Sequence, residues 1–541
     1  MALTDRRWWL TPILGAATTA SRVRTAGFWT VLVFALGVFS LGIGVPDAWG
    51  DESASWLAVT RPWRGIPVLL TAGDAPLVPY YVLVKLVLTV VPLPPLLVMR
   101  AMSALAAAVA VAALYSLVVR RAGLLPALTA SVMMVALPGL SRYAQEARPY
   151  ALLVMTSTLA WLAWDTWVRP GQARTGAGEF RRPGSVLGAV AYVGTLAGSV
   201  VFHLFGGLNW PAQLLADATT PKLSAGQRLR RVLTTAGAMV VAILLVLVPV
   251  GWALRNGTGP HHAKVLSDAE VWRTYIHSIT VAIDPVPAIP VLVLAAVGLA
   301  AVVLRWRAWR RFADLARVAA IWLLVPLGLA MGLGVVKHQL MSSRYWTQSL
   351  APLALLAGIG LVVLAELGYR AAQWGLRSVA RQSRHRWGVV VAVVVLAVGL
   401  GSVIAAGIPQ QVKVRSVGGH AMEISAAYAR IEPQLAADPT LKVIIAPRLA
   451  TAAALARYPD LRPRDIYDRV NQRSALPWPE PRRWAAVRAD LKAAHRIVWL
   501  RQQGYADHPH SLHIAAALAR SGFQLTGLEV VGSFTVMIWQ R

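Results

Sequence analysis

Three carboxylates lie close together in residues 49–81, the first sizeable polar stretch after the first apolar segment. Asp51 and Glu52 are adjacent, and Asp74 follows a run rich in tryptophan, arginine and proline. Carboxylates beside aromatic rings suit a wet pocket that binds a polyhydroxylated ligand and removes a proton from it. A solvated interfacial loop, anchored at the lipid headgroups by its tryptophans, would look the same. The stretch alone leaves both interpretations open.

The composition predicts a polytopic membrane protein. Hydrophobic residues make up 57% of the 541 residues and charged residues only 14%, so many apolar runs are long enough to cross a bilayer. The net charge of +29 comes from short arginine clusters between these runs, which is typical of cytoplasmic loops and argues against a nucleic-acid partner. The chain has no cysteine, and His261 and His262 lack further ligands at a suitable spacing, so no metal site is predicted.

Arginine placement predicts the orientation. Arginines near the amino terminus favour a cytoplasmic N-terminus and a first span at about 27–45, which places residues 49–81 outside. Residues 76–93 are apolar but short, and they contain two early prolines and Lys85. Counting them as a span would put every later arginine cluster on the outer face. We therefore predict a helix that lies in the outer interface.

The remaining apolar segments complete an all-α bundle of about eleven transmembrane helices within residues 1–411. Beyond the first span, they are expected at about 96–118, 122–140, 150–168, 184–202, 203–219, 232–253, 286–304, 318–336, 346–368 and 388–408.

Residues 412–541 have an ordinary soluble composition, and the topology places them outside the membrane. Short β-rich runs, KVIIAP at 442, RIVWL at 496 and VVGSFTVMIW at 530, alternate with helical stretches such as EISAAYARI and SLHIAAALARSG. This alternation predicts a small extracytoplasmic α/β domain. No glycine-rich phosphate loop follows a strand, so a nucleotide site is not expected there.

Two other outer loops bring ionisable groups to the same side as the acidic stretch. The loop SRYAQEARPY at 141 carries Glu146 and Arg148, where charges are costly unless they are paired or face a watery cavity. The loop from Lys337 to Tyr345 also carries His338 and Arg344. Arginine there suits phosphate recognition, and snorkelling to lipid headgroups is the alternative.

A histidine marks the outer end of another predicted span. His203 lies in the sequence VFHLFGGLNW and could bond a ligand hydroxyl, although a lone histidine in a helical bundle is more often a packing residue. Carboxylates and cations on the outer face of a lipid-embedded bundle together imply a substrate with a phosphate, a polar acceptor and an apolar portion. A lipid-linked phosphosugar has all three.

Several motifs resemble a known family. WGDES at 49, GDAPLVPYY at 73, LSRYAQEARPYALL at 140, FHLFGGL at 202 and SSRYWTQSLAPLALLAG at 342 are similar to motifs of the polyprenyl-phosphate-sugar-dependent glycosyltransferases of the GT-C superfamily. The likeness is to glycosyltransferase family 39, the protein-O-mannosyltransferase and aminoarabinose-transferase-like branch, and it covers about the first 370 residues. It implies a GT-C bundle with interfacial helices in the first outer loop.

The resemblance also implies roles for individual residues. Asp51 would be the catalytic base of an inverting transfer, and Glu52 or Asp74 would orient hydroxyl groups. The cations expected at the donor phosphate are Arg148, Arg344, Lys85 and Lys337. The residues expected to contact substrate are Glu146, Tyr80, Tyr81, His203, His338 and Tyr345.

The implied donor is a polyprenyl-phosphate sugar, with mannose or arabinose favoured, and the implied acceptor is an envelope glycan, glycolipid or protein. No cofactor is required, while a divalent cation is left open. Abundant arginine and alanine suggest a multi-pass protein of a bacterial plasma membrane. The alternative is a lipid or glycolipid transporter or flippase, although such proteins tend to place ionisable residues at the bilayer midplane rather than at helix ends.

Overall fold

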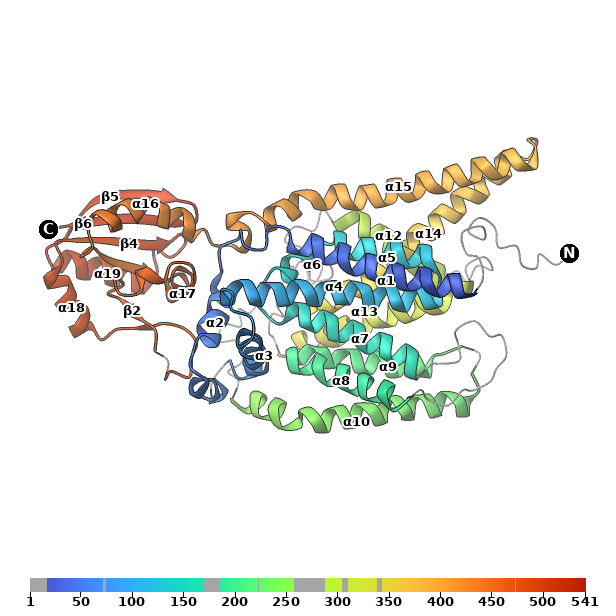
Figure 1. The fold of residues 1–541 in the computed structure, drawn as a ribbon, viewed down its shortest axis with the longest axis horizontal. Helices are drawn as coiled ribbons and strands as arrows, with labels where there is room; N and C mark the ends of the chain where they lie inside the picture. The colour runs from blue at the N-terminus through green and yellow to red at the C-terminus, as the bar shows by residue number, and fades with distance from the viewer. Residues whose placement is uncertain are drawn as a thin grey trace.

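The computed structural model describes residues 17–71, 74–168, 185–221, 223–256, 288–303, 310–337, 343–471 and 473–541. A bundle of long helices forms most of the molecule, and a smaller α/β domain lies at the end of the bundle opposite the start of the first helix (Figure 1). This architecture confirms the predicted fold class, a helical multi-span membrane protein with a small C-terminal mixed-sheet domain.

Every predicted span contains a helix. The bundle helices are α1 (Ala17–Ser40), α4 (Pro95–Arg121), α5 (Leu124–Ala136), α6 (Pro138–Ala144), α7 (Tyr150–Trp167), α8 (Val186–Phe202), α9 (Asn209–Ala218), α10 (Ala225–Asn256), α12 (Ile289–Val303), α13 (Arg310–Lys337), α14 (Leu350–Gly375) and α15 (Arg381–Val414).

Among the residues that the structure describes, length and composition alone single out fewer candidate spans than the eleven predicted. Within the described residues six helices are long and apolar enough to cross a membrane, or seven if α5 and α6, bent by 66° at Leu137, form one span. Helices α8, α9 and α12 have only 17, 10 and 15 residues. The chain also breaks at His203 between α8 and α9, and a count from apolar runs cannot register such a break.

Two short helices precede α4 outside the bundle proper. Helix α2 (Gly50–Val59) follows α1, and α3 (Val78–Leu88) comes after three 3₁₀ turns between Trp63 and Leu77. With 11 residues at 1.5 Å each, α3 is too short to cross a bilayer core of about 30 Å. This length agrees with its exclusion from the predicted spans.

A break between α8 and α9 shapes the same end of the bundle. His203 has extended backbone angles and is followed by the 3₁₀ turn η5 (Leu204–Leu208). Gly206 in this turn packs so closely on α8 that a Cβ atom would lie 2.2 Å from the carbonyl oxygen of Ser199. The glycine therefore permits a tight joint that directs His203 and the start of α9 inward.

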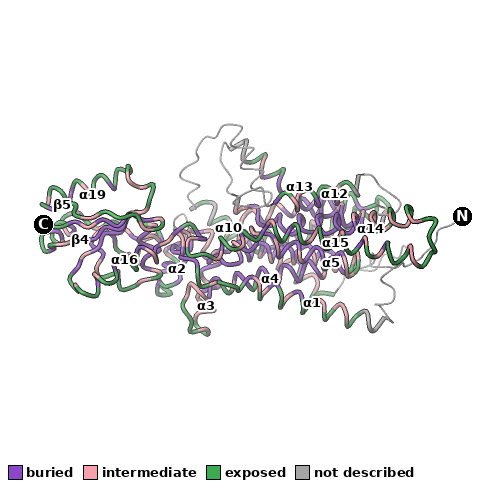
Figure 2. The backbone as a smooth tube through the Cα atoms, turned by 90° about the horizontal axis from the view of Figure 1, so that it is seen from above, coloured by how far each residue is buried: buried purple, intermediate pink, exposed green. Residues whose placement is uncertain are grey.

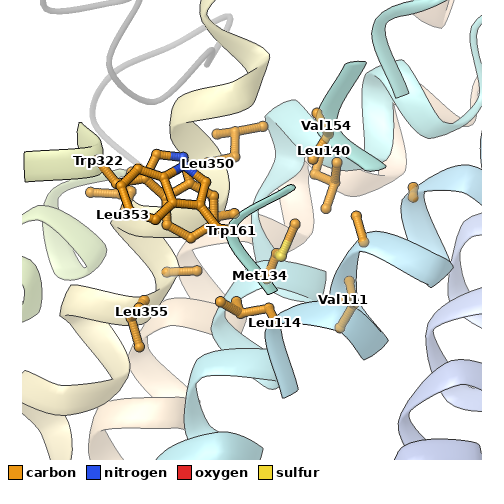
Figure 3. Close-up of a cluster of buried hydrophobic side chains, with 14 of the residues drawn as sticks. Val111, Leu114, Met134, Leu140, Val154, Trp161, Trp322, Leu350, Leu353 and Leu355 are labelled. Atoms are coloured by element: carbon orange, nitrogen blue, oxygen red, sulfur yellow. The ribbon is translucent and has the colours of Figure 1, made fainter. Parts of the chain in front are cut away.

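The bundle core is large, dry and rich in tryptophan. The rings of Trp161 on α7 and Trp322 on α13 stack with centroids 5.0 Å apart, beside Leu350 and Leu353 of α14 (Figure 3). Buried positions run along the middle of the bundle, whereas the outer helices α10 and α15 are mostly exposed (Figure 2). Their exposed side chains are largely apolar, as expected for helices that face lipid.

The C-terminal domain is built on a four-stranded mixed sheet of order β1-β4-β6-β5. Strand β1 (Lys442–Ala446) pairs in parallel with β4 (Arg496–Gln502), which pairs antiparallel with β6 (Phe534–Gln540). The third predicted β-rich run, 530–539, contains the end of β5 (Gln524–Val531), a reversal at Gly532, at φ +57°, and most of β6.

Helices α16 (Ile424–Ala437) and α19 (Pro509–Arg520) confirm the two predicted helical stretches of this domain. Helices α17 (Arg448–Arg457) and α18 (Trp484–Ala493) and the short pair β2 (Asp468–Arg469) and β3 (Glu480–Pro481) complete it. Helix α17 packs against α2, so α2 lies between the domain and the bundle.

Close packing of α12 on α14 gives a test of the bundle. A Cβ atom added at Gly360 would lie 1.9 Å from the carbonyl oxygen of Leu294 on α12, so Gly360→Ala must force the helices apart. We expect a loss of about 1–3 kcal/mol in the free energy of unfolding, seen as a lower thermal midpoint. Gly328→Ala on α13 is the matched control, because nothing lies within 4 Å of its added Cβ. Equal midpoints for the two variants would contradict this packing.

Candidate functional site

The first turn of α2 places two adjacent carboxylates on different sides of the helix. Trp49 is the N-cap, and Glu52 at the third position accepts a hydrogen bond from the Trp49 backbone N–H at 3.4 Å, which forms a capping box. Successive residues of an α-helix are about 100° apart, so Asp51 and Glu52 cannot share one environment. The Asp51 side chain is 21% exposed, whereas that of Glu52 is fully buried.

Asp51 meets the two predicted phosphate-binding arginines. Its Oδ2 atom accepts a hydrogen bond from Arg344 Nη1 at 2.6 Å and lies 3.8 Å from Arg148 Nη2. Arg148 also donates to the Ser55 hydroxyl one turn along α2, at 3.3 Å. Three residues that are far apart in the sequence thus form one cluster at the surface of the junction.

Aromatic rings pack around the guanidinium groups. The Arg344 guanidinium lies 5.5 Å from the ring centroid of Trp49 and 5.8 Å from that of Tyr345. A guanidinium group keeps its charge at any working pH, so Arg344 is a permanent positive charge held against ring faces.

Asp74, like Asp51, is partly exposed, but it has a different partner. Its Oδ2 atom accepts a hydrogen bond from the Tyr81 hydroxyl at 2.6 Å, and burial raises the pKa of Asp74 although Arg148 lowers it. Tyr80 is also buried, and its ring lies 5.9 Å from that of Tyr81. The predicted triad of carboxylates is therefore split, with Asp51 and Asp74 partly exposed and Glu52 fully buried.

The broken helix brings a row of rings to the arginines. His203 lies 4.8 Å from Tyr345 and 5.9 Å from Tyr150, measured between ring centroids, and Phe205 lies 5.3 Å from Tyr345. This row can pack on a sugar ring or an apolar chain, and the imidazole of His203 adds a hydrogen-bonding edge.

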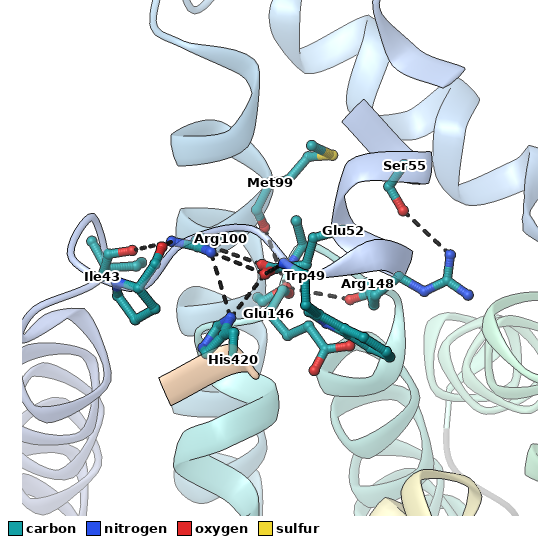
Figure 4. A network of polar contacts seen from close by, with 12 residues as sticks. Ile43, Trp49, Glu52, Ser55, Met99, Arg100, Glu146, Arg148 and His420 are labelled. Atoms are coloured by element: carbon teal, nitrogen blue, oxygen red, sulfur yellow. Dashed lines mark hydrogen bonds and ion pairs between the residues drawn. The ribbon is translucent and has the colours of Figure 1, made fainter. Parts of the chain in front are cut away.

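Glu146 is a second buried carboxyl group near the cluster. It is 1% exposed, and its Oε2 atom lies 2.8 Å from Nη1 of Arg142, four residues earlier. Burial raises the pKa of Glu146 to about 7, against the lowering effect of Arg142. The carboxyl group lies beside the Trp49 indole ring (Figure 4).

Glu52 makes all its contacts with protein groups. Arg100 of α4 donates to both of its oxygens at 2.9 Å, the Ala147 backbone N–H donates at 2.9 Å, and His420 Nδ1 lies 2.8 Å from Oε2 (Figure 4). The arginine that pairs with Glu52 is thus Arg100 and not one of the predicted phosphate-binding cations. Burial alone would raise the pKa of Glu52, but Arg100 and His420 hold it well below its usual range. Direct contact of Glu52 with a substrate hydroxyl does not fit this enclosure.

Lys85 is not directed at the arginine cluster. Its Nζ atom donates to the backbone carbonyls of Val59 at 3.0 Å and Arg61 at 2.6 Å, and it lies 5.0 Å from the centroid of the Trp63 ring. It therefore satisfies carbonyls at the C-terminal end of α2, a position that favours a cation. Lys337 ends α13, but its side chain and all of His338 lie outside the described residues.

Two of the most enclosed polar residues were missed in the sequence. Arg100 is a single charge inside the apolar run 95–119, and such a residue is by default a functional or structural signal. His420 follows the last predicted span without any motif, so nothing local marks it. Among the described residues no three His, Asp or Glu side chains come together in a way that could hold a metal ion, and the divalent cation stays open.

The raised pKa of Glu146 predicts a pH-dependent stability. The folded protein keeps this proton up to about pH 7, whereas an unfolded glutamate loses it near 4.5, so the free energy of unfolding falls as pH rises between these values. Glu146→Gln cannot ionise and lacks this contribution of up to about 3 kcal/mol. The thermal midpoint of each protein is measured at pH 5 and at pH 8. Between these pH values it should fall further in the wild type than in Glu146→Gln. An equal change of the thermal midpoint in the two proteins would contradict a buried, protonated Glu146.

Comparison with known proteins connects this geometry to a fold. No protein-family model matches the sequence, and comparison with the curated proteins gives no match either. Among solved structures, ArnT from Cupriavidus metallidurans in the apo state matches with a TM-score of 0.53 at 14% identity, over 97% of this chain and 98% of ArnT. The same enzyme bound to undecaprenyl phosphate matches with a TM-score of 0.51 at 15% identity over the same shares.

A weaker likeness extends to the oligosaccharyltransferase AglB from Archaeoglobus fulgidus, with a TM-score of 0.46 at 10% identity over 87% of this chain and 69% of AglB. The ArnT match spans nearly the whole length of both chains, including the C-terminal domain. The chain therefore has a fold like that of ArnT.

Proposed function

We propose that this chain is an inverting membrane glycosyltransferase that moves a sugar from a polyprenyl-phosphate donor to a hydroxyl group of a cell-envelope glycan, glycolipid or protein. The observation that carries the proposal is the partly exposed Asp51 carboxylate, held against Arg148 and Arg344 at the end of the bundle. The fold shared with ArnT, which has been solved with undecaprenyl phosphate bound, supports this substrate class. Mannose or arabinose is the favoured sugar, and family 39 remains the expected relationship.

The two arginines suit the donor phosphate. A phosphate that binds Arg148 and Arg344 takes the place of Asp51 as their partner and frees the carboxylate. Negative charge grows on the phosphate as the bond to the anomeric carbon breaks, and fixed cations stabilise that charge in the transition state. Guanidinium groups are suited to this because they remain charged at any working pH and can bind two oxygens at once.

Asp51 is the proposed base. It takes the proton of the acceptor hydroxyl while the hydroxyl oxygen attacks the anomeric carbon from the face opposite the leaving phosphate, and polyprenyl phosphate departs with the bonding electron pair. Asp74 accepts a hydrogen bond from Tyr81, and we propose that it orients a hydroxyl group of the substrate. Glu146, His203 and Tyr345 lie around the cluster and are proposed to contact the sugar or the acceptor.

A lipid or glycolipid transporter is the second candidate. The break between α8 and α9 at His203 favours it, because secondary transporters place discontinuous helices at their substrate sites. A transporter moves its lipid without cleaving it. Release of free polyprenyl phosphate from the donor therefore separates the two functions.

The assay tests the proposed base, Asp51, and the proposed phosphate-binding residue, Arg344, in the same preparation. Purified protein in nanodiscs receives polyprenyl-phosphate mannose or arabinose with a set of glycan and glycolipid acceptors, and free polyprenyl phosphate and donor affinity are measured. Asp51→Asn keeps the size of the side chain but cannot accept the proton, so turnover should fall roughly 10²- to 10⁴-fold with little change in donor affinity. Arg344→Ala should weaken donor binding as well, and Arg344→Lys should restore it only in part.

Control variants decide which carboxylate acts. Asp165→Asn alters an acid that pairs with Arg121 at the far end of the bundle and should keep turnover near that of the wild type. Near-normal turnover in Asp51→Asn together with loss in Asp74→Asn would move the base to Asp74. Donor binding that survives Arg344→Ala and Arg148→Ala would place the phosphate elsewhere.

The orientation in a bacterial plasma membrane is part of the proposal. Arginine clusters favour an outward-facing site and C-terminal domain. A reporter that is active only outside the cytoplasm should work when fused after Arg541 and fail when inserted between α14 and α15, near Ser378. An active reporter at the second position, with an inactive but expressed fusion at the first, would reverse the orientation.

A further inference from the structure

Glu52 is held from several sides by other groups of the protein. Its carboxylate meets Arg100 from α4, the backbone N–H of Ala147 from the loop before α7, and His420 from the turn between α15 and the C-terminal domain. Arg100 continues the network by donating to the carbonyls of Ile43 at 3.0 Å and Pro46 at 2.8 Å. The first turn of α2 is therefore tied at once to the bundle, to the chain that leads into it and to the C-terminal domain.

The junction with the C-terminal domain carries further contacts around the same turn. The Asp47 backbone N–H donates to the Val417 carbonyl at 2.9 Å, and the Asp47 carboxylate accepts hydrogen bonds from the Ser425 backbone and hydroxyl. Gly50 faces Leu449 of α17 so closely that an added Cβ would lie 3.1 Å from the leucine side chain.

The far end of α2 is held in the same way. Arg61, just after the helix, is 2% exposed and donates to the backbone carbonyls of Ser474 and Leu476 at 2.6 and 2.5 Å. Helix α2 is thus clamped at both ends by the C-terminal domain. A movement of that domain has to be transmitted to the helix that carries Asp51.

Asp51 and Glu52 are consecutive, so whatever fixes Glu52 also fixes Asp51. The partners of Asp51 are Arg148, from the loop before α7, and Arg344, from the 3₁₀ turn η8 (Ser343–Ser349) before α14. Neither belongs to the C-terminal domain. A shift of α2 would therefore change the distance between Asp51 and the two arginines. Misplacement of a catalytic group by about 1 Å can cost about 10²-fold in rate.

We propose that Glu52, Arg100 and His420 are positioning residues, through which the C-terminal domain sets the place of Asp51 relative to Arg148 and Arg344. The inference rests on the proposed function, because it assigns these residues a role in the same transfer. The domain then belongs to the catalytic unit rather than serving only as an appendage on the outer face.

The state of His420 makes the proposal testable by a matched pair of substitutions. Its ring is fully buried, and burial together with Arg142 lowers the pKa of His420 to about 4, although Glu52 raises it. The neutral ring must carry its hydrogen on Nδ1 to donate to Glu52. Asparagine can present an N–H near the position of Nδ1, whereas glutamine presents one near Nε2.

The experiment compares His420→Asn with His420→Gln in full-length protein in nanodiscs. We expect His420→Gln to lower kcat roughly 10- to 100-fold with a donor KM within about threefold of the wild type, because the arginines stay in place. His420→Asn should keep kcat within about threefold of the wild type. Ser425→Ala is the junction control: it removes one hydrogen bond to Asp47, keeps the backbone bond and does not contact Glu52. Its kcat should stay near that of the wild type.

A second readout does not depend on activity. The chain has no cysteine, so spin labels at Thr60→Cys, the C-cap of α2, and Ala429→Cys on α16 report one distance between the two elements. His420→Gln should broaden this distance distribution, while His420→Asn and Ser425→Ala should leave it narrow.

The outcomes separate the two proposals. Equal kcat for the Asn and Gln variants, or a distance distribution that is unchanged in His420→Gln, would overturn the positioning role. Absence of donor cleavage in the wild type would overturn the proposed function instead, and the label distances would still test the coupling of α2 to the C-terminal domain.

Discussion

The pair of Glu52 and Arg100 is almost completely removed from water at the point where the bundle, the chain entering α2 and the C-terminal domain meet. Burying two charges costs more than their attraction returns unless further hydrogen bonds satisfy both groups. Here Ala147 and His420 provide the further hydrogen bonds to the Glu52 carboxylate. The carbonyls of Ile43 and Pro46 accept those of the Arg100 guanidinium. Loss of any partner leaves a buried charge uncompensated, so the three parts are constrained to one arrangement.

The same constraint explains why the chemistry gathers where it does. Glu52 faces the interior and fixes the first turn of α2. Asp51 therefore lies on another side of the helix, where it contacts Arg148 and Arg344 from two other loops. The broken helix at His203 adds neutral rings beside these charges. A partly exposed carboxylate, fixed cations and an aromatic wall form a site that is polar on one side and apolar on the other. A lipid-linked phosphosugar has this combination of groups.

The bundle supplies the rigidity that such a site needs. Stacked tryptophans and close helix contacts through Gly298 and Gly360 hold α7, α12, α13 and α14 together. The loops with Arg148 and Arg344 are attached directly to α7 and α14. Catalytic groups on rigid elements keep their geometry better than groups on free loops, and the C-terminal domain extends this rigidity to α2.

The sequence by itself determined the membrane class, the α/β character of the last 130 or so residues and the side of the bundle to which Asp51, Arg148 and Arg344 belong, because hydropathy and arginine placement are properties of local composition. Only the tertiary structure decided how the adjacent acids divide. Asp51 faces the arginines and Glu52 faces Arg100 and His420, because neighbours on a helix point about 100° apart and their partners come from distant parts of the chain. Tertiary structure likewise directs Lys85 to the carbonyls at the end of α2. The last carbonyl groups of a helix have no partner within the helix, and sequence spacing does not reveal which side chain donates to them.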